Sequence, residues 1–331
     1  MEIVEGELMM KDHWERTEES ILLDFTEIED IIKPAFPNKK LISAERIGTG
    51  LSNSNYKILM EGSEAPYVFR LYRGDKGVAD KELAISKHVS QSVPVANFIY
   101  ADTTCTHTLH PWAVMEWKEG ILLRDLIRNG TKSDIISAAT SVGRSLADVH
   151  QYTFSESGFF DKDLNIKAPM TMDADRFLSF IEQSLFHQPC GIWLGEELIQ
   201  QVWSYCQNYS PLLSESDEKP VLVHSDFNGL NILVRDDVVD CAVSAILDWE
   251  FAFAWNRYVD IGNMLRYEED GSLYEEHFIR AYREQGGILH KNWRILSKLE
   301  DLVALCEMLN HSTLDTPRRI HDLQRLVSRI V

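Results

Sequence analysis

The sequence has few cysteines, and none of them occurs in a metal-binding spacing. The five stand singly along the chain, without any Cys-x-x-Cys pair: Cys105, Cys190, Cys206, Cys241 and Cys306. An odd number of scattered cysteines offers neither a disulfide framework nor a zinc site. We therefore expect free thiols and a reducing, cytoplasmic environment.

Long apolar runs are also missing. No stretch approaches the roughly 20 apolar residues that a membrane-spanning helix requires. The N-terminal residues MEIVEGELMMKDHWERTEES are acidic and polar, whereas a signal peptide is basic and then apolar. The sequence therefore predicts neither membrane insertion nor secretion.

Basic residues are scarce relative to acidic ones. The chain has 33 Lys and Arg against 52 Asp and Glu, which gives a formal net charge of −19. This charge repels nucleic acid and anionic membrane surfaces, so we expect neither as a partner. It would attract a cationic small molecule, although any soluble acidic protein carries a similar charge. With 331 residues, 44% of them hydrophobic, the chain can form one large or two medium domains.

The most informative stretch lies between residues 221 and 250. An apolar run ends in His224-Ser-Asp226, Asn231 follows five positions after the aspartate, and a second apolar run begins at once. A third apolar run, SAIL, leads to Asp248. The predicted strands VLV and NILV bracket the loop, and the strand SAIL delivers Asp248 at its end. This layout is typical of kinases.

The residue types in this layout suit phosphoryl transfer. Mg²⁺ prefers oxygen ligands and usually takes one or two carboxylates together with phosphates. Asn231 and Asp248 can supply an amide oxygen and a carboxylate to the metal. Asp226 then remains available to accept the proton of an acceptor hydroxyl, while His224 braces the loop. The same residues could instead serve as turn formers, but the bracketing strands favour the kinase interpretation.

These motifs resemble those of the aminoglycoside phosphotransferase and choline kinase-like family. The resemblance rests on His224-Ser-Asp226 through Asn231, Asp248-Trp-Glu250 and Asp260-Ile-Gly-Asn263, and it extends from about Ile47 to the end of the chain. It implies an α+β, two-lobed protein-kinase-like fold, with a small β-rich N-terminal lobe and a larger, mainly helical C-terminal lobe. It further implies that ATP or GTP, bound with Mg²⁺, donates a phosphoryl group to a small-molecule hydroxyl.

A β-rich segment near the N-terminus predicts the nucleotide-binding lobe. Residues 18–35 read as a short amphipathic helix, and strands follow between Leu41 and Tyr72. The turn between the first two strands contains the small residues that would contact phosphates: Gly48, Gly50, Ser52 and Asn53. Gly-x-Gly permits close approach of the backbone to phosphate, but a plain hairpin turn would look much the same.

The resemblance assigns further nucleotide-binding residues in this lobe. Arg70, on the YVFRLY strand, stands where the family has a phosphate-gripping cation, and Glu82 on the following helix is its natural partner. An exposed helical charge is the alternative for Glu82. Glu116 and Trp117 stand where the family's hinge reads adenine through its backbone. The predicted divisions are an N-terminal helical extension (1–40), a small nucleotide-binding lobe (41–118) and a large lobe (119–331).

The large lobe reads as mainly helical. Thr131-x-x-Asp134 resembles a capping box ahead of a core-facing helix that closes at His150. Residues 172–210 and 272–331 also read as helices. Asp260 is expected to anchor the backbone of the catalytic loop, as structural support.

The acceptor is expected to be a small molecule. Asp260 follows Asp248 by only twelve positions, and no Ala-Pro-Glu follows, which leaves little room for a polypeptide-binding segment. The acidic run Glu268-Glu269-Asp270 could meet a polycation, although a solvated helix end explains it as well. An aminoglycoside is the expected acceptor, with choline, ethanolamine, homoserine or methylthioribose as alternatives. A nucleotide-binding pseudokinase without turnover is the competing hypothesis, favoured only by Arg in place of the usual Lys.

Overall fold

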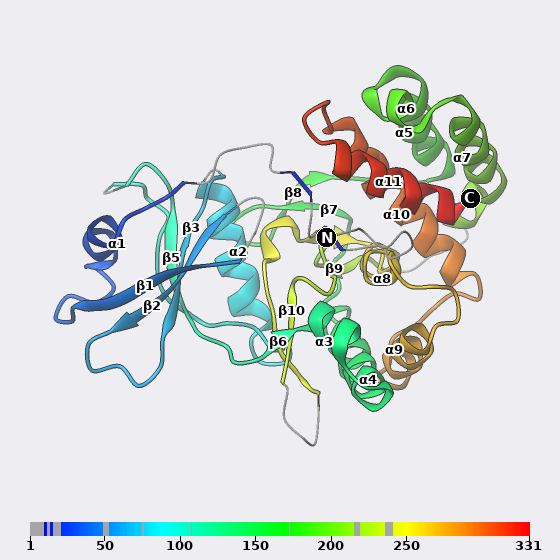
Figure 1. Ribbon diagram of the computed structural model, residues 1–331. Coiled ribbons are helices and arrows are strands. Elements are labelled where there is room, and N and C mark those ends of the chain that lie inside the picture. The colour runs from blue at the N-terminus through cyan, green and yellow to red at the C-terminus, as the bar shows by residue number, and fades with distance from the viewer. Residues whose placement is uncertain are drawn as a thin grey trace.

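The chain divides into a sheet-rich part and a helix-rich part (Figure 1). The computed structural model describes residues 10–11, 14–15, 21–48, 53–74, 76–106, 108–171, 173–214, 219–235 and 241–331. The predicted α+β architecture, with a β-rich N-terminal lobe and a mainly helical C-terminal lobe, is confirmed.

The small lobe is built on a five-stranded antiparallel sheet in the order β1-β2-β3-β5-β4. Its strands are β1 (Leu41–Ile47), β2 (Ser54–Met60), β3 (Tyr67–Leu71), β4 (Phe98–Asp102) and β5 (Trp112–Glu116). Along β2, buried residues alternate with partly exposed ones, as expected for a strand that buries one face. The β1–β2 pairing closes at Ile47 and Asn55, so the predicted phosphate-contacting turn lies at the end of this hairpin.

The N-terminal helix is shorter than its sequence pattern suggests. Instead of covering 18–35, α1 spans Phe25–Ile32. Asp24 fixes its start, because its side chain accepts from the Glu27 N–H while the Glu27 carboxylate accepts from the Asp24 N–H; such a capping box holds a helix at one register. Ile28 and Ile32 pack into the same hydrophobic cluster as β2, so α1 is an integral layer of the small lobe.

Helix α2 (Lys76–Val89) lies between the small sheet and the large lobe (Figure 1). It contacts the short 3₁₀ helix η2 (Trp249–Phe251), which directly follows Asp248. Because Glu82 lies on α2 and is only 3% exposed, this helix carries a buried charge to the boundary between the lobes.

Two small antiparallel sheets in the large lobe hold the predicted site residues. One has the order β11-β10-β6 and the other β8-β7-β12-β9. Their strands are β6 (Ile121–Leu122), β7 (Gly158–Phe160), β8 (Ile166–Pro169), β9 (Val221–Val223), β10 (Ile232–Val234), β11 (Val243–Ile246) and β12 (Phe253–Trp255). The three strands predicted around the His-x-Asp motif are therefore present. We propose the lobe boundary near residue 118, because β5 belongs to the small sheet whereas β6 already pairs with β10.

Helices form the remainder of the large lobe. They are α3 (Leu123–Asn129), α4 (Lys132–Val149), α5 (Ala174–His187), α6 (Pro189–Leu194), α7 (Glu196–Tyr209), η1 (Ser210–Ser214), α8 (Tyr258–Leu265), α9 (Leu273–Glu284), α10 (Trp293–Asn310) and α11 (Pro317–Ile330). The predicted capping box at Thr131 and Asp134 is present at the start of α4. Among the described residues, no helix has the length and apolar character needed to cross a membrane.

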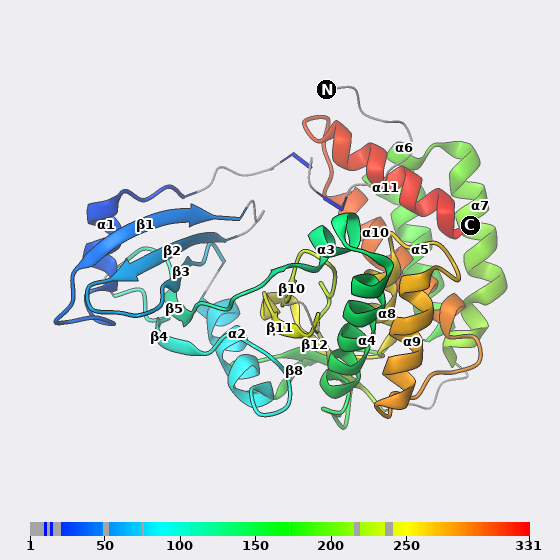
Figure 2. The same ribbon diagram turned by 60° about the horizontal axis from the view of Figure 1, so that its bottom comes forward.

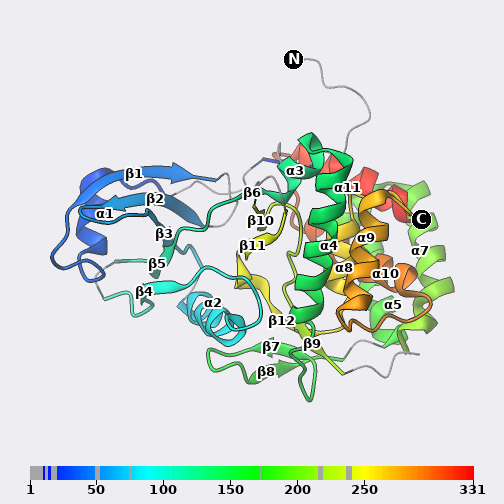
Figure 3. The same cartoon turned by 90° about the horizontal axis from the view of Figure 1, so that it is seen from below.

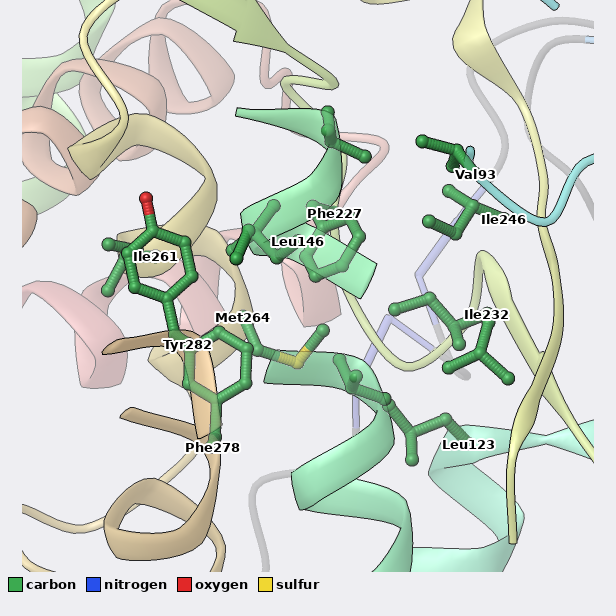
Figure 4. Close-up of a cluster of buried hydrophobic side chains, with 14 of the residues drawn as sticks. Val93, Leu123, Leu146, Phe227, Ile232, Ile246, Ile261, Met264, Phe278 and Tyr282 are labelled. Carbon is green, nitrogen blue, oxygen red and sulfur yellow. The ribbon is translucent and has the colours of Figure 1, made fainter. Parts of the chain in front are cut away.

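Helices α4 and α9 lie side by side (Figures 2 and 3). Gly143 permits this contact, since a Cβ at this position would stand 2.3 Å from the carbonyl oxygen of Phe278 on α9. The pair supports the main hydrophobic core, in which Phe227 from the loop after β9 packs among Leu146, Ile232 and Met264 (Figure 4). Burial of Phe227, which is 0% exposed, fixes the position of the neighbouring Asp226.

Candidate active site

The loop from His224 to Asn231 connects β9 to β10 and presents Asp226 to the space between the lobes. Asn231 Nδ2 donates to Asp226 Oδ2 at 2.7 Å, and Asn228 Nδ2 donates to Oδ1 at 2.8 Å. The Asp226 side chain is 25% exposed. Two amides thus hold the carboxylate in one orientation while part of it stays accessible.

Asp260, in the first turn of α8, holds this loop in place through hydrogen bonds to its backbone. Its two carboxylate oxygens accept the backbone N–H groups of His224 and Ser225, each at 2.8 Å. His150 Nε2 lies 3.2 Å from Asp260 Oδ2 in the same buried network. The His224 ring in turn contacts the carbonyl oxygen of Leu247 through Nε2 at 2.8 Å. His224 and Asp260 therefore link the loop to α8 and to the strand that precedes Asp248.

Asp248 follows β11 in a left-handed conformation, with φ of 68°. Arg70 from β3 reaches across the interlobe space, and its Nη1 lies 3.2 Å from Asp248 Oδ1 and 2.7 Å from Glu82 Oε1. Arg70 Nε also donates to Asn55 Oδ1 at 3.0 Å. Burial raises the pKa of Asp248, and the Arg70 charge offsets only part of that rise. The structure thus brings together Arg70, Glu82 and Asp248, as the sequence predicted for the first two.

Glu250 adds a second carboxylate beside Asp248. Asn53 Nδ2 donates to Glu250 Oε2 at 3.1 Å, while Oε1 is buried and has no hydrogen-bond partner among the residues that the structure describes. Burial, together with the negative charge of Asp248, raises the pKa of Glu250 to about 8. Because the partly exposed Asp248 carboxylate and the buried Glu250 carboxylate repel each other, a cation beside them would be stabilised.

The donor set fits magnesium that is shared with phosphate groups. Asn231 uses its amide nitrogen on Asp226, so its amide oxygen can act as a ligand, and Asp248 supplies a carboxylate. No cluster of three or more His, Cys, Asp or Glu side chains suited to a metal occurs within the described part of the chain. Mg²⁺ usually takes one or two carboxylates and completes its octahedron with phosphates and water, which matches this sparse oxygen set.

A cleft of about 2260 Å³ joins these residues. On its small-lobe side it is lined by predicted nucleotide-binding residues: Gly48, Asn53, Arg70, Glu82, Glu116 and Trp117. Gly48 has a φ of 72°, which a residue with a side chain rarely adopts. Glu116 Oε1 accepts from the backbone N–H of Asn97 at 3.0 Å. Gly50 and Ser52 lie outside the described residues.

The other side of the cleft carries both apolar side chains and cations. Its lining comes from the N-terminal segment, β7, β8, α5, β12, α10 and α11, and includes Trp14, Phe159, Met170, Phe180, Phe253, Trp255, Val303, Ala304 and Met308. Lys11, Arg176 and Arg319 contribute positive charge, and Glu300 and Glu307 contribute acidic groups. Sequence reasoning missed Lys11 and Trp14, since nothing in a polar N-terminal stretch indicates that it reaches the cleft.

The acidic run that was expected to meet an acceptor lies elsewhere. Glu268, Glu269 and Asp270 line a separate pocket of about 240 Å³, not the cleft that holds Asp226. Asp270 is paired there with Lys298 at 2.9 Å, and Glu268 accepts from the Ser272 hydroxyl at 2.7 Å. The structure therefore does not bring these three residues to Asp226, because they fall beyond the end of α8, where Glu268 is bonded to the N-cap residue of α9 and Asp270 is paired with α10.

A comparison with protein families decides the class of the chain. A sequence model of the phosphotransferase enzyme family matches residues 43–296, which is most of the chain. The chain belongs to the phosphotransferase enzyme family. It is accordingly a small-molecule kinase. A comparison with curated proteins found no match.

Solved structures share the phosphotransferase fold at low identity. A mutant of aminoglycoside 2'-phosphotransferase-IIIa in complex with GDP has a TM-score of 0.71 at 18% identity, over 93% of this chain and 97% of that one. Aminoglycoside phosphotransferase APH(4)-Ia has a TM-score of 0.66 at 14% identity, over 92% and 99% of the two chains. A protein from Thermobifida fusca YX-ER1, described as a candidate fructosamine-3-kinase, has a TM-score of 0.61 at 16% identity, over 93% and 99%.

The family match leaves out two parts of the cleft wall. It begins at residue 43 and ends at residue 296, so Lys11 and Trp14 precede it, and α11 follows it. The phosphotransferase motifs around Asp226 and Asp248 lie well inside the match. One side of the cleft therefore combines segments outside the family match with β7, β8, α5 and β12, which lie inside it.

Proposed function

We propose that this phosphotransferase transfers the γ-phosphoryl group of ATP or GTP, bound with Mg²⁺, to a hydroxyl of a small molecule. The observation that carries the proposal is the geometry of Asp226. Its carboxylate is partly exposed and is oriented by Asn231 at 2.7 Å, and it lines the same cleft as Asp248. A proton acceptor beside a metal-binding carboxylate is what in-line phosphoryl transfer requires.

Each residue has a distinct part in the proposed reaction. Asp226 accepts the proton of the acceptor hydroxyl, whose oxygen forms the new bond to phosphorus as the bond to the β–γ bridging oxygen breaks. Arg70, positioned by Glu82, directs positive charge toward the donor phosphates. The Gly48 turn lets the backbone approach them. Asn231 and Asp248 would hold Mg²⁺, which neutralises charge on the phosphates when it is bound.

Comparison with solved structures supports the nucleotide and an amino-sugar class of acceptor. Related structures include ternary complexes of APH(4)-Ia variants with ADP or AMP-PNP and hygromycin B, and a GDP complex of aminoglycoside 2'-phosphotransferase-IIIa. An aminoglycoside is therefore the first acceptor to test. The apolar lining and the cations Lys11, Arg176 and Arg319 are a reason to test uncharged hydroxylated acceptors with an apolar body alongside it.

The experiment is an acceptor screen that measures nucleotide consumption with and without Mg²⁺. The wild type should turn over nucleotide with at least one acceptor, and Asp226→Asn should lower kcat by about 10²- to 10⁴-fold, the range typical of a general base. Nucleotide affinity should change little, because the base acts on the acceptor. Asp315→Asn, the same change at an exposed site, is the matched control. Nucleotide binding without any Asp226-dependent turnover would instead indicate a pseudokinase.

A further inference from the structure

Four residues that precede the family match form an anchor on the large lobe: Met10, Lys11, Trp14 and Glu15. The Glu15 carboxylate accepts the backbone N–H groups of Arg318 and Arg319 at 3.0 and 3.2 Å, in the first turn of α11. The N-cap residue of α11 makes no side-chain capping bond, so Glu15 serves as its cap. Trp14 Nε1 donates to Asp322 Oδ2 on the same helix at 2.9 Å.

The anchor brings Lys11 onto the carboxylate of Asp226. Lys11 Nζ lies 2.9 Å from Asp226 Oδ1, and the Lys11 side chain is only 17% exposed. Buried Met10 lies against the same loop, since its sulfur would stand 3.2 Å from a Cβ added at Gly229. The Lys11–Asp226 ion pair joins residues that are 215 positions apart. Because Met10 on one side of Lys11 and the anchored Trp14 and Glu15 on the other hold this segment in place, they limit where the Lys11 ammonium can reach.

The backbone around this contact is strained in a way that often accompanies function. Lys11, Ser225 and Asp248 have positive φ angles of 44°, 70° and 68°. They are three of the five non-glycine residues with this conformation in the described part of the chain. Such conformations cost energy and tend to cluster at active sites. Here Lys11 contacts the Asp226 carboxylate, Ser225 directly precedes Asp226, and Asp248 lines the same cleft.

Within the described part of the chain, the Lys11 ammonium has one hydrogen-bond partner, the Asp226 carboxylate. An acceptor oxygen that hydrogen-bonds to Asp226 Oδ1 must lie within about 3 Å of that oxygen, so it would be within about 6 Å of Lys11 Nζ, which is 2.9 Å from the same oxygen. An ammonium carries three N–H donors on a flexible stem, and only one is used on Asp226. By contrast, Arg70 is engaged by Glu82, Asp248 and Asn55, and Arg266 is engaged by Asp301.

We propose that Lys11 is a further catalytic residue, which donates hydrogen bonds to the phosphoryl group while that group passes from nucleotide to acceptor. This inference rests on the proposed function. In the step, the acceptor oxygen bonds to the γ-phosphorus, the bond to the bridging oxygen breaks with its electron pair on ADP, and the hydroxyl proton moves to Asp226. Negative charge on the equatorial oxygens of the moving group is what Lys11 would stabilise.

The test measures a transition-state analogue, so that no acceptor needs to be known. The affinity for ADP with Mg²⁺ is compared with that for ADP, Mg²⁺ and aluminium fluoride, which imitates the phosphoryl group in transfer. The wild type should bind the fluoride complex more tightly than ADP. Lys11→Met should lose that gain by roughly 10- to 100-fold, leave ADP affinity unchanged and lower the basal hydrolysis rate. Lys11→Arg should keep part of the gain, and Lys291→Met at an exposed site should keep all of it.

Each other result overturns the proposal in a recognisable way. An unchanged fluoride gain in Lys11→Met would make Lys11 a purely structural contact. A faster basal reaction in that variant would mean that Lys11 blocks the site until the acceptor displaces it. If wild-type protein binds ADP and Mg²⁺ but gains nothing from fluoride, the catalytic role of Lys11 is wrong while nucleotide binding stands. Failure to bind either ADP or GDP would refute the proposed function itself, because that function allows ATP or GTP as the donor.

Discussion

Because of Glu300 on α10, the free energy of unfolding of this protein should fall as pH rises. The residue is 5% exposed, and its carboxylate accepts hydrogen bonds from Trp255 Nε1, at 3.2 Å, and from Asn256 Nδ2. Neither partner is charged. Burial therefore dominates and raises the pKa of Glu300 to about 7 from an ordinary value of 4.5. The perturbation that tests this is Glu300→Gln, which removes the titration and retains the side-chain volume.

The size and sign of the effect follow from linkage. One pKa unit is worth about 1.4 kcal/mol, so a pKa that moves from 4.5 to about 7 corresponds to about 3 kcal/mol. Between these two values the unfolded chain has lost the Glu300 proton while the folded protein keeps it. The unfolded state therefore binds fewer protons, and the free energy of unfolding decreases with pH across this window. Below pH 4.5 Glu300 causes no loss of stability, because it is protonated in both the folded and the unfolded state. Above pH 7 it is ionised in both states, and the loss of stability stays constant.

Urea unfolding of both proteins at several pH values between 4.5 and 8 measures the effect. The difference in unfolding free energy between Glu300→Gln and wild type should shift by about 3 kcal/mol in favour of the variant across this range. Any hydrogen bond that the amide loses adds an offset that does not depend on pH. Glu307→Gln, whose side chain is 54% exposed on the same helix, serves as the control and should give a far smaller change. Parallel profiles for Glu300→Gln and wild type would refute the reasoning.

Two further predictions test the site and the fold. Asp248→Ala should weaken binding of nucleotide in the presence of Mg²⁺ by at least about tenfold, because the metal loses its carboxylate. Calorimetry with and without Mg²⁺ checks this, and a normal metal-dependent affinity would remove Asp248 from the proposed metal site. Gly143→Ala should lower the free energy of unfolding by about 1 to 3 kcal/mol, because its Cβ would meet the Phe278 carbonyl oxygen at 2.3 Å. Denaturant unfolding measures this, and an unchanged midpoint would mean that α4 and α9 can separate without cost.

The sequence by itself determined the features that depend on short spacing. Asp226 and Asn231 are five residues apart in a tight loop between two strands, and such a loop brings its polar side chains together whatever surrounds it. Arg70 and Glu82 are twelve residues apart, on a strand and the helix that follows, so their pairing could also be anticipated. The capping box at Thr131 is local in the same sense. These motifs were also sufficient to indicate the family.

Only the tertiary structure decided which distant segments close the cleft. Lys11 reaches Asp226 across 215 residues, and that contact depends on Glu15 and Trp14 docking onto α11 at the opposite end of the chain. The charge pattern of Glu268, Glu269 and Asp270 did not indicate that these residues would line a separate pocket. Charge and hydropathy are properties of residue types, whereas the direction in which a side chain points depends on how whole helices pack. For this reason the loop that carries Asp226 could be predicted from the sequence, and the wall that faces it could not.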